Sequence, residues 1–250
     1  MEIGKPEYLF RFVSLSGKRK DTKKKLYSLK NNYIWFSDPA MLNDPFECKA
    51  LLVDYDQLLK EGRSKEEVDE VKYMLERMCL IASFTDNIET NLPMWAYYAN
   101  NHRGFCIKYK VEKPEKIFNV DCREQREPAT ETIKKLLDAY NIGKDQTKSI
   151  EEQGRAQLIM QLSMRVLREN YRIKHLSWAH ENEYRAIHMR DKSDLSAGKN
   201  VPADEVGLTI VAIYTGVNCC YHGKIKKIAD RLNVPCMKCK VDEKKFLLVT

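Results

Sequence analysis

The stretch SWAHENEYRAIHM, residues 177–189, passes from a charged segment into the alternating pattern of a β-strand at EYRAIHM. If HENEYR is extended as well, successive side chains point to opposite faces, so Glu181, Glu183 and Arg185 share one face. Two carboxylates on one face repel each other, which raises the pKa of one, while a neighbouring arginine lowers the pKa of both. The segment is therefore either a charge ladder on the protein surface or part of a site that binds a substrate.

Strands and helices alternate along the rest of the chain. No internal repeat and no linker rich in proline and glycine divides residues 1–250, so we expect a single domain. The mixture predicts an α+β fold, with short strands in small sheets and helices between them. Strands are predicted at residues 8–14, 33–37, 79–85, 104–111, 183–189 and 207–216, and helices at 64–78, 93–103, within 129–173 and at 221–233.

The composition is typical of a globular protein. Hydrophobic residues make up 43% and charged residues 32% of the 250 residues, which argues against wholesale disorder. No apolar run approaches the roughly 18 residues needed to span a bilayer. The start MEIGKPEYLFRF lacks the apolar core and cleavage site of a signal peptide. We therefore expect a cytoplasmic protein with no membrane partner.

Basic residues exceed acidic residues. The formal net charge is +7, and part of this excess lies in GKRKDTKKK, residues 17–25. Such a run either contacts a phosphate backbone or forms a solvated segment that leads into a helix. A catalytic domain that acts on an anionic ligand is also compatible with this balance.

The eight cysteines are predicted to be reduced thiols, because the chain shows no secretion signal. The nearest approach to a metal motif combines Cys219, Cys220 and His222 with the later pair Cys236 and Cys239. Adjacent cysteines such as the first two rarely place both sulfurs on one tetrahedral ion. We therefore expect no metal.

A polar loop, FSDPAMLNDPFE at residues 36–47, follows the aromatic strand YIWFS. Its two Asp-Pro steps restrict the backbone, so the loop holds Asn43, Asp44 and Glu47 at a low entropic cost. Polar side chains on a stiff loop favour a binding site. In the alternative interpretation, Asp44 accepts hydrogen bonds from nearby backbone amides and only stabilises a turn.

The helix predicted within MWAYYANNH carries Trp95, Tyr98 and His102 at positions i, i+3 and i+7, which share one helical face. An aromatic stripe of this kind packs in a core or lines a ligand site. Polar residues at its end favour the second interpretation, in which His102 is a general base or orients a ribose. In the first interpretation His102 is structural.

Taken in order, these motifs resemble the bacterial domain-of-unknown-function family 2971. The matching segments YLFRF, YIWFSDPAMLNDPFE, SFT, MWAYYANNHRGFCIKY and LSWAHENEYRAI span nearly the whole chain. The most specific parts are the Asn-Asp-Pro-Phe-Glu loop and the Trp-x-x-Glu-x-Glu-x-Arg segment. The resemblance implies a component of bacterial stress or phage-defence systems.

A more distant resemblance links the chain to the ADP-ribosyltransferase superfamily. It rests on a basic residue in an early strand, a strand that ends in serine, and a late Glu-x-Glu pair. The resemblance implies an ADP-ribosyltransferase-like fold with NAD as substrate, in which Glu183 holds the ribose and stabilises the oxocarbenium-like transition state. It implies that Glu181 activates the acceptor and Arg11 holds a phosphate or ribose, with Ser37 at the end of the second strand. The usual Ser-Thr-Ser motif is replaced by WFS, and no long substrate loop precedes the acidic pair.

Three hypotheses for the function follow. The first is an NAD-binding enzyme that cleaves the nicotinamide bond or transfers ADP-ribose to a protein or nucleic-acid acceptor. The second is a nuclease in which Asp44, Glu47 and the Glu-x-Glu pair ligate Mg²⁺. The third is a non-catalytic sensor of a nucleotide-like small molecule or a partner protein. The candidate catalytic residues are Glu183, Glu181 and His102, and the candidate ligand-binding residues are Arg11, Ser37, Asn43, Asp44, Glu47, Trp95, Tyr98 and Arg185.

Overall fold

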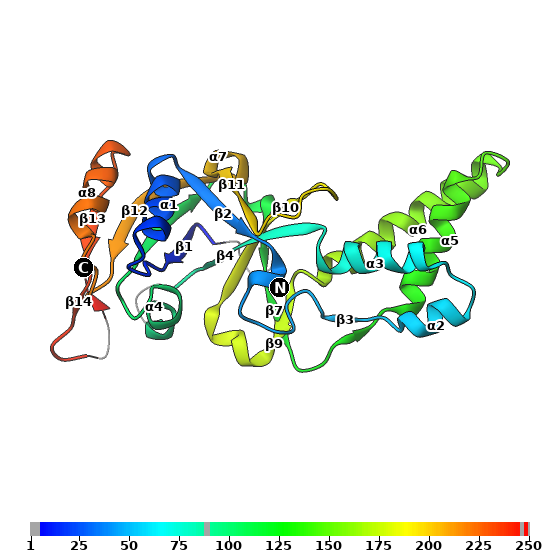
Figure 1. Cartoon of the computed structure of the whole chain (residues 1–250), viewed down its shortest axis with the longest axis horizontal. Coiled ribbons are helices and arrows are strands. Elements are labelled where there is room, and N and C mark those ends of the chain that lie inside the picture. The colour runs from blue at the N-terminus through cyan, green and yellow to red at the C-terminus, as the bar shows by residue number, and fades with distance from the viewer. Residues whose placement is uncertain (1–5, 88–90, 246–247, 250) are drawn as a thin grey trace.

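The computed structural model describes residues 6–87, 91–245 and 248–249. Within these residues, a mixed sheet of nine strands forms the centre of the molecule (Figure 1). Its main path is, in spatial order, β11 (Gly198–Pro202), β2 (Tyr33–Ser37), β4 (Cys79–Thr85), β1 (Tyr8–Val13), β5 (Phe105–Val111), β12 (Leu208–Thr215) and β13 (Cys236–Lys238), while β10 (Glu183–Met189) pairs with β4 and with β6 (Ile117–Asn119). Within this sheet the paired strands are antiparallel, except that β12 and β13 run parallel.

Strand β4 has a forked edge. On one side it pairs with β10 along its whole length, from Thr85 opposite Glu183 to Cys79 opposite Met189. The other side meets β1 only at Thr85 and β2 only at Ile81. The two strands therefore diverge from the same edge of β4, and Ser83 lies between their two contact points. The divergence of β1 and β2 therefore leaves a gap in the sheet beside Ser83 of β4.

One face of the sheet is covered by α1 (Arg19–Lys30), the short α7 (Ala203–Val206) and α8 (His222–Arg231). The amphipathic pattern of α8 buries Ile225 and Ala229 on the side of the helix that packs on β12 and β13, and α1 buries Leu29 where it packs on β2. Helices α1 and α8 contact each other although they are far apart in the sequence (Figure 1).

A helical arm extends from the sheet (Figure 1). It consists of α2 (Tyr55–Lys60), α3 (Lys65–Glu76), α5 (Thr130–Lys144) and α6 (Ile150–Glu169), which pack around a second hydrophobic cluster. A capping box of Ser64 and Glu67 starts α3, and a second one, Ser149 with Glu152, starts α6. The arm thus has its own core, which includes Val71, Ile133 and Leu167.

The remaining elements are short. Helix α4 (Leu92–Tyr98) packs against β1. Short 3₁₀ helices occur at η1 (Pro39–Met41), η2 (Pro114–Lys116) and η3 (Leu176–Glu181). Three two-stranded sheets join β3 (Leu51–Leu52) to β8 (Glu127–Pro128), β7 (Asp121–Arg123) to β9 (Ile173–His175), and β14 (Lys240–Val241) to β15 (Leu248–Val249). The predicted α+β fold with small sheets is confirmed, although the central sheet is larger than expected. No helix in the described part of the chain is both long and apolar enough to cross a bilayer.

Candidate functional site

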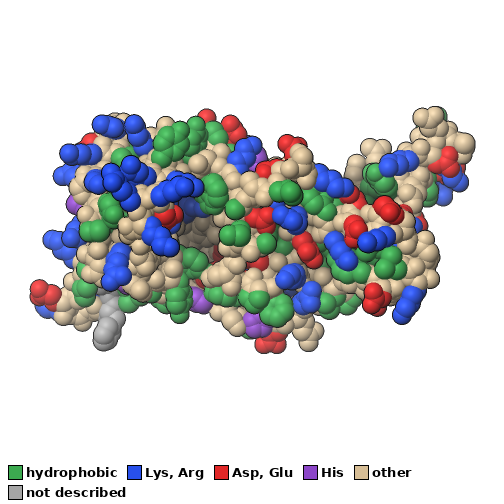
Figure 2. Space-filling model, in the orientation of Figure 1, with side chains coloured by type: hydrophobic (Ala, Val, Ile, Leu, Met, Phe, Trp, Pro, Cys, Tyr) green, Lys and Arg blue, Asp and Glu red, His purple; other side chains and the backbone are tan. Residues whose placement is uncertain are grey.

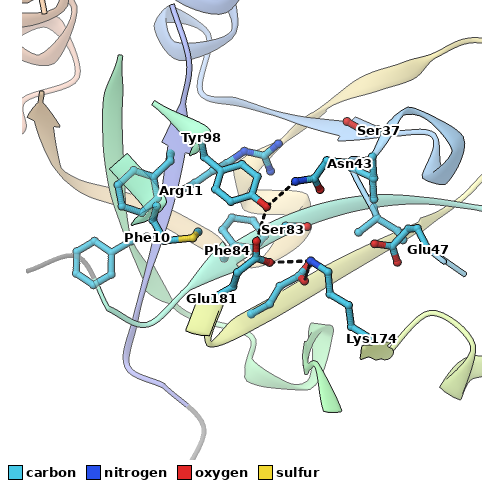
Figure 3. Close-up of a pocket in the computed structure, with 15 residues that line it drawn as sticks. Phe10, Arg11, Ser37, Asn43, Glu47, Ser83, Phe84, Tyr98, Lys174 and Glu181 are labelled. Atoms are coloured by element: carbon cyan, nitrogen blue, oxygen red, sulfur yellow. Dashed lines mark hydrogen bonds and ion pairs between the residues drawn. The ribbon is translucent and has the colours of Figure 1, made fainter. Parts of the chain in front are cut away.

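A cavity of about 160 Å³ lies in the fork of the sheet (Figure 3). Phe10, Arg11 and Phe12 of β1 line one side, and Ser37 at the end of β2 lines another. The base is formed by Ile81, Ser83 and Phe84 of β4, where the two strands diverge. The lining is completed by Leu42, Asn43, Glu47, Met94, Tyr98, Lys174, Glu181 and Glu183. Segments far apart in the sequence therefore meet at one opening of the sheet.

The loop after β2 brings Asn43 and Glu47 to this cavity. Asp38 starts η1 by accepting a hydrogen bond from the amide of Ala40, and Arg190 pairs with the same carboxylate at 2.7 Å. Asp44 accepts a hydrogen bond from the amide of Phe46 at 2.9 Å, which is the turn interaction predicted as one alternative. Asp44 does not line the cavity. Its role visible in the structure is to shape the turn before Glu47.

The HENEYR segment is not continuous strand. Glu181 ends η3, Asn182 has the left-handed conformation (φ 43°), and Glu183 begins β10. Asparagine adopts this conformation more readily than most residues. The alternation expected for an extended chain therefore applies only to Glu183 and Arg185, which share one face of β10. Glu181 reaches the same site from a helical turn.

Five buried charged side chains form what we call the charge cluster: Glu47, Lys174, Glu181, Glu183 and Arg185. Arg185 is completely buried and donates to both oxygens of Glu47, at 2.6 and 3.0 Å, and to both oxygens of Glu183, at 2.7 and 3.1 Å. Lys174 donates to Glu181 at 2.7 Å and to Glu183 at 3.0 Å. Three carboxylates thus face two cations, and the cluster has a formal charge of −1.

Three members of the charge cluster, Glu183, Lys174 and Arg185, are held in their ionised forms. Burial alone would raise the pKa of Glu183, but Arg185 and Lys174 beside it lower this pKa to about 2. Burial likewise opposes the charge of Lys174, yet Glu183 and Glu181 raise the pKa of its ammonium group above the ordinary value. For Arg185, the two facing carboxylates outweigh burial and raise its pKa further. At neutral pH these three groups are therefore charged.

Tyr98 connects the cluster to the loop. Its hydroxyl donates to Glu181 and accepts a hydrogen bond from the amide of Asn43 at 3.0 Å (Figure 3). Burial, and then the contact with Glu181, raises the pKa of Tyr98 above its usual range. Tyr98 is therefore a neutral hydrogen-bond donor at physiological pH, and it orients the Glu181 carboxylate.

Arg11 faces the cavity without a carboxylate partner. One terminal nitrogen donates to the carbonyl of Trp35 at 2.5 Å, and the guanidinium lies 5.4 Å from the centre of the Phe84 ring. The other terminal nitrogen is buried and has no hydrogen-bond partner among the described residues. Burial lowers the pKa of this guanidinium, since no described carboxylate forms an ion pair with it. Arg11 therefore has donor capacity available for a ligand.

Besides Asp44, three predicted site residues do not line the cavity: Arg185, Trp95 and His102. Arg185 bonds to the lining residues Glu47 and Glu183, whereas Trp95 and His102 lie elsewhere. Trp95 is completely buried in a core cluster, where its ring packs edge-on against Phe12 and stacks on His102. The predicted helix through His102 is wrong, because α4 ends at Tyr98 and residues 100–102 are left-handed. His102 consequently leaves the helical face that it was expected to share with Tyr98. It lines a separate hollow beside β14 and is not among the cavity residues.

Lys174 belongs to the site but was not predicted from the sequence. This residue lies in β9, and its ammonium group bridges Glu181 and Glu183. Its side chain also lies 4.7 Å from the ring centre of Trp178. A lysine between isoleucine and histidine gives little signal by itself, because the same pattern occurs where a lysine on a short strand simply points to solvent. Phe10, Phe12 and Phe84 of the aromatic lining were also not predicted, because a phenylalanine in a strand looks the same whether it packs in the core or lines a cavity.

The structure also bears on metal binding. In residues 6–87, 91–245 and 248–249, no group of three or more His, Cys, Asp or Glu side chains has an arrangement that could hold a metal ion. Cys219 and Cys239 are buried in different hydrophobic clusters. In the cavity, the oxygens of Glu47 and Glu183 pair with Arg185, so a cation at these carboxylates would have to displace the arginine.

A family model described as "Protein of unknown function (DUF2971)" matches residues 94–186. The match covers 93 of the 250 residues, so this part of the chain is similar to the family that the motifs resemble. The matched region includes Tyr98, Lys174, Glu181, Glu183 and Arg185, whereas the cavity residues from β1, β2 and the following loop precede it. Comparisons with curated proteins and with solved structures give no match.

Proposed function

We propose that the cavity binds NAD and that the protein is an ADP-ribosyltransferase-like enzyme. One observation carries the proposal: a buried charge cluster with one excess negative charge faces an arginine that has free donor capacity. NAD presents a positive nicotinamide ring and a negative diphosphate, which match these two features in sign. The setting that the family resemblance implies is bacterial stress or phage defence.

In the proposed reaction, the bond between the ribose C1′ and the nicotinamide nitrogen breaks, and its electron pair neutralises the ring. Positive charge develops on the ribose, and Glu183 stabilises it. The acceptor, either water or a nucleophilic group of a macromolecule, then bonds to C1′ and loses its proton to Glu181. Ion pairs hold Glu183 ionised and oriented before the substrate arrives, so little reorganisation is needed during the reaction.

The size of the cavity limits how much of NAD it encloses. Its volume of about 160 Å³ is below the roughly 300–1,000 Å³ of pockets that enclose a whole drug-sized ligand. We therefore place the nicotinamide ring and its ribose inside, against the aromatic side chains of Phe10 and Phe84. The diphosphate extends towards Arg11, whose unpartnered nitrogen suits a phosphate oxygen or a ribose hydroxyl.

The test is nicotinamide release from NAD by the wild type and by Glu183→Gln, at equal concentrations of folded protein. We expect the variant to lose at least 100-fold, about 2.7 kcal/mol of transition-state stabilisation. Glu66→Gln, an exposed position on α3, is the matched control and should keep full activity. If the wild type releases no nicotinamide, even with cell extract as a source of acceptors, the proposal is wrong.

A second candidate is a non-catalytic NAD sensor that uses the same cavity. It is favoured by the observation that Glu183 and Glu181 have a hydrogen-bond partner on every carboxylate oxygen. A thermal melt with NAD separates the two candidates, since a ligand at 100 times its Kd adds about 2.7 kcal/mol of stability. Stabilisation by NAD without nicotinamide release would favour the sensor.

A further inference from the structure

Helices α1 and α8 together form a strongly basic surface. Both pack on the same side of the sheet and contact each other, although almost the whole chain separates them in sequence. Figure 2 shows the blue Lys and Arg side chains gathered over this end of the molecule. We call it the basic helix face, and its exposed members are Lys18, Arg19, Lys20, Lys23, Lys24, Lys30, Lys224, Lys226, Lys227 and Arg231.

This surface accounts for the positive charge of the whole protein. Residues 18–30 and 222–231 hold 11 of the 43 Lys and Arg but only two of the 36 Asp and Glu. The rest of the chain therefore has 32 basic and 34 acidic residues and is slightly negative. The net charge of +7 is thus a local feature of two helices, which the sequence shows only in part as the run at residues 17–25.

The cations of the basic helix face are almost entirely unpaired. Within the described residues, Lys25 alone of the 11 forms an ion pair, with Asp21 at 3.0 Å. Repulsion between like charges three or four residues apart weakens a helix. Elsewhere some surface cations are paired, as Lys134 with Glu61 and Arg155 with Glu151, and others, such as Lys60 and Lys135, form no ion pair with a described residue. The basic helix face differs from the rest of the surface in its density of cations, with 11 Lys and Arg and only two acidic residues on two adjacent helices, and this density suits an external anion.

We propose that the basic helix face binds the phosphate backbone of nucleic acid. Helix α1 has 12 residues and at 1.5 Å per residue runs for roughly 18 Å. Duplex nucleic acid carries one charge per roughly 1.7 Å of its axis, so α1 alone can run beside about ten phosphates. Helix α8 adds a second row of cations beside the first. Extended rows of this kind match a linear polyanion.

The apolar residues argue against a membrane as the partner. A helix that lies on a membrane presents Leu, Phe or Trp to the lipid beneath its basic residues. Here the apolar sides of both helices already pack on the sheet, through Leu29, Ile225 and Ala229. The only exposed large hydrophobic side chain on the described α1 and α8 is Tyr27. Proteins that bind the phosphate backbone of nucleic acid contact it through Lys and Arg and need no apolar side chains for this contact.

The test is a fluorescence anisotropy titration of the full chain with labelled 20-nucleotide duplex DNA, duplex RNA and single-stranded DNA. We expect binding of at least one of these at 50 mM salt, with a linear fall of log K against log salt concentration. The paired changes Lys20→Glu with Lys24→Glu, and Lys224→Glu with Lys227→Glu, should each weaken binding at least tenfold. Because the readout needs no NAD, its result is independent of the proposed enzyme activity.

The matched control is the double change Lys60→Glu with Lys135→Glu on the helical arm, which alters the net charge by the same amount. Both lysines are exposed and form no ion pair with a described residue. This variant should bind within about twofold to threefold of the wild type. The proposal is overturned if none of the three nucleic acids binds at 50 mM salt, or if the control loses as much affinity as the helix variants. It is also overturned if vesicles with 30% phosphatidylserine bind more tightly than nucleic acid through the same lysines. Thermal melts of all variants verify that each is folded.

Discussion

The charge cluster and the basic helix face use charge in opposite ways. In the cluster, Arg185 and Lys174 are buried, and every cation bonds to a carboxylate. On the basic helix face, the cations are exposed and nearly all unpaired. Burial explains the difference, because an unpaired charge is costly away from water but tolerable at the surface. Pairing fixes geometry at short range, whereas unpaired surface charge acts at long range and depends on salt.

The largest effect should come from breaking the pairing in the cluster. Arg185→Met removes a fully buried guanidinium and leaves Glu47 and Glu183 facing each other without it. We expect a loss of about 3–5 kcal/mol in the free energy of unfolding, because breaking a buried pair leaves an uncompensated charge. For a chain of this size the melting temperature should fall by about 6–20 °C. Calorimetry at pH 7 measures it, with the exposed Arg165→Met as control; equal small losses in both variants would contradict the account.

The acid side of the stability profile tests the same pairing by protonation. The pKa of Glu183 is lowered to about 2 when folded, below that of a free glutamate, so its contribution is present at neutral pH. This contribution should be lost as the pH falls below about 4.5 towards 2, since protonation removes both ion pairs. The stability difference between wild type and Glu183→Gln should therefore shrink by about 2 kcal/mol between pH 6 and pH 3. Urea unfolding across this range measures it, and a difference independent of pH would show that the Glu183 charge does not stabilise the fold.

Asp44 combines features of the two regions, because it is buried like the charge cluster but has no ion-pair partner among the described residues, like most cations of the basic helix face. Asp44→Ala removes the acceptor for the Phe46 amide and should cost about 1–2 kcal/mol. Asp44→Asn keeps an acceptor oxygen at the same position, so we expect it to lose less than half as much. Urea midpoints of the two variants distinguish the roles. A larger loss in Asp44→Asn than in Asp44→Ala would mean that the charge, and not the turn interaction, is needed.

The smallest effect on stability should come from the basic helix face. Lys24→Ala removes an exposed, unpaired ammonium group and should change the free energy of unfolding by no more than about 0.5 kcal/mol. Any gain from reduced repulsion should disappear between 50 and 500 mM NaCl, because salt screens surface charges. The loss in Arg185→Met should persist over the same range. If salt abolished the Arg185 effect instead, the cluster would be solvated like a surface.

Much of the fold could be predicted from local patterns. The strands at β1, β2, β4 and β5, the capping box at Ser64 and the α+β class follow from alternation, propensity and hydrogen-bonding chemistry within a few residues. The extent of α4 could not be predicted. A helical pattern continues to His102 in the sequence, but the chain turns left-handed at residues 100–102 and packs His102 on Trp95. That choice depends on packing partners from distant segments.

The sequence by itself predicted seven of the cavity residues from charge, spacing and resemblance. They are Arg11, Ser37, Asn43, Glu47, Tyr98, Glu181 and Glu183. The tertiary structure decided how they meet. The forked edge of β4 makes the opening, and Lys174 and Arg185 neutralise the carboxylates that converge there. Likewise, only the packing of α8 beside α1 joined two basic segments into one surface. Alternation and capping act within a few residues and can be read along the chain, whereas ion pairing and burial depend on which distant segments come together.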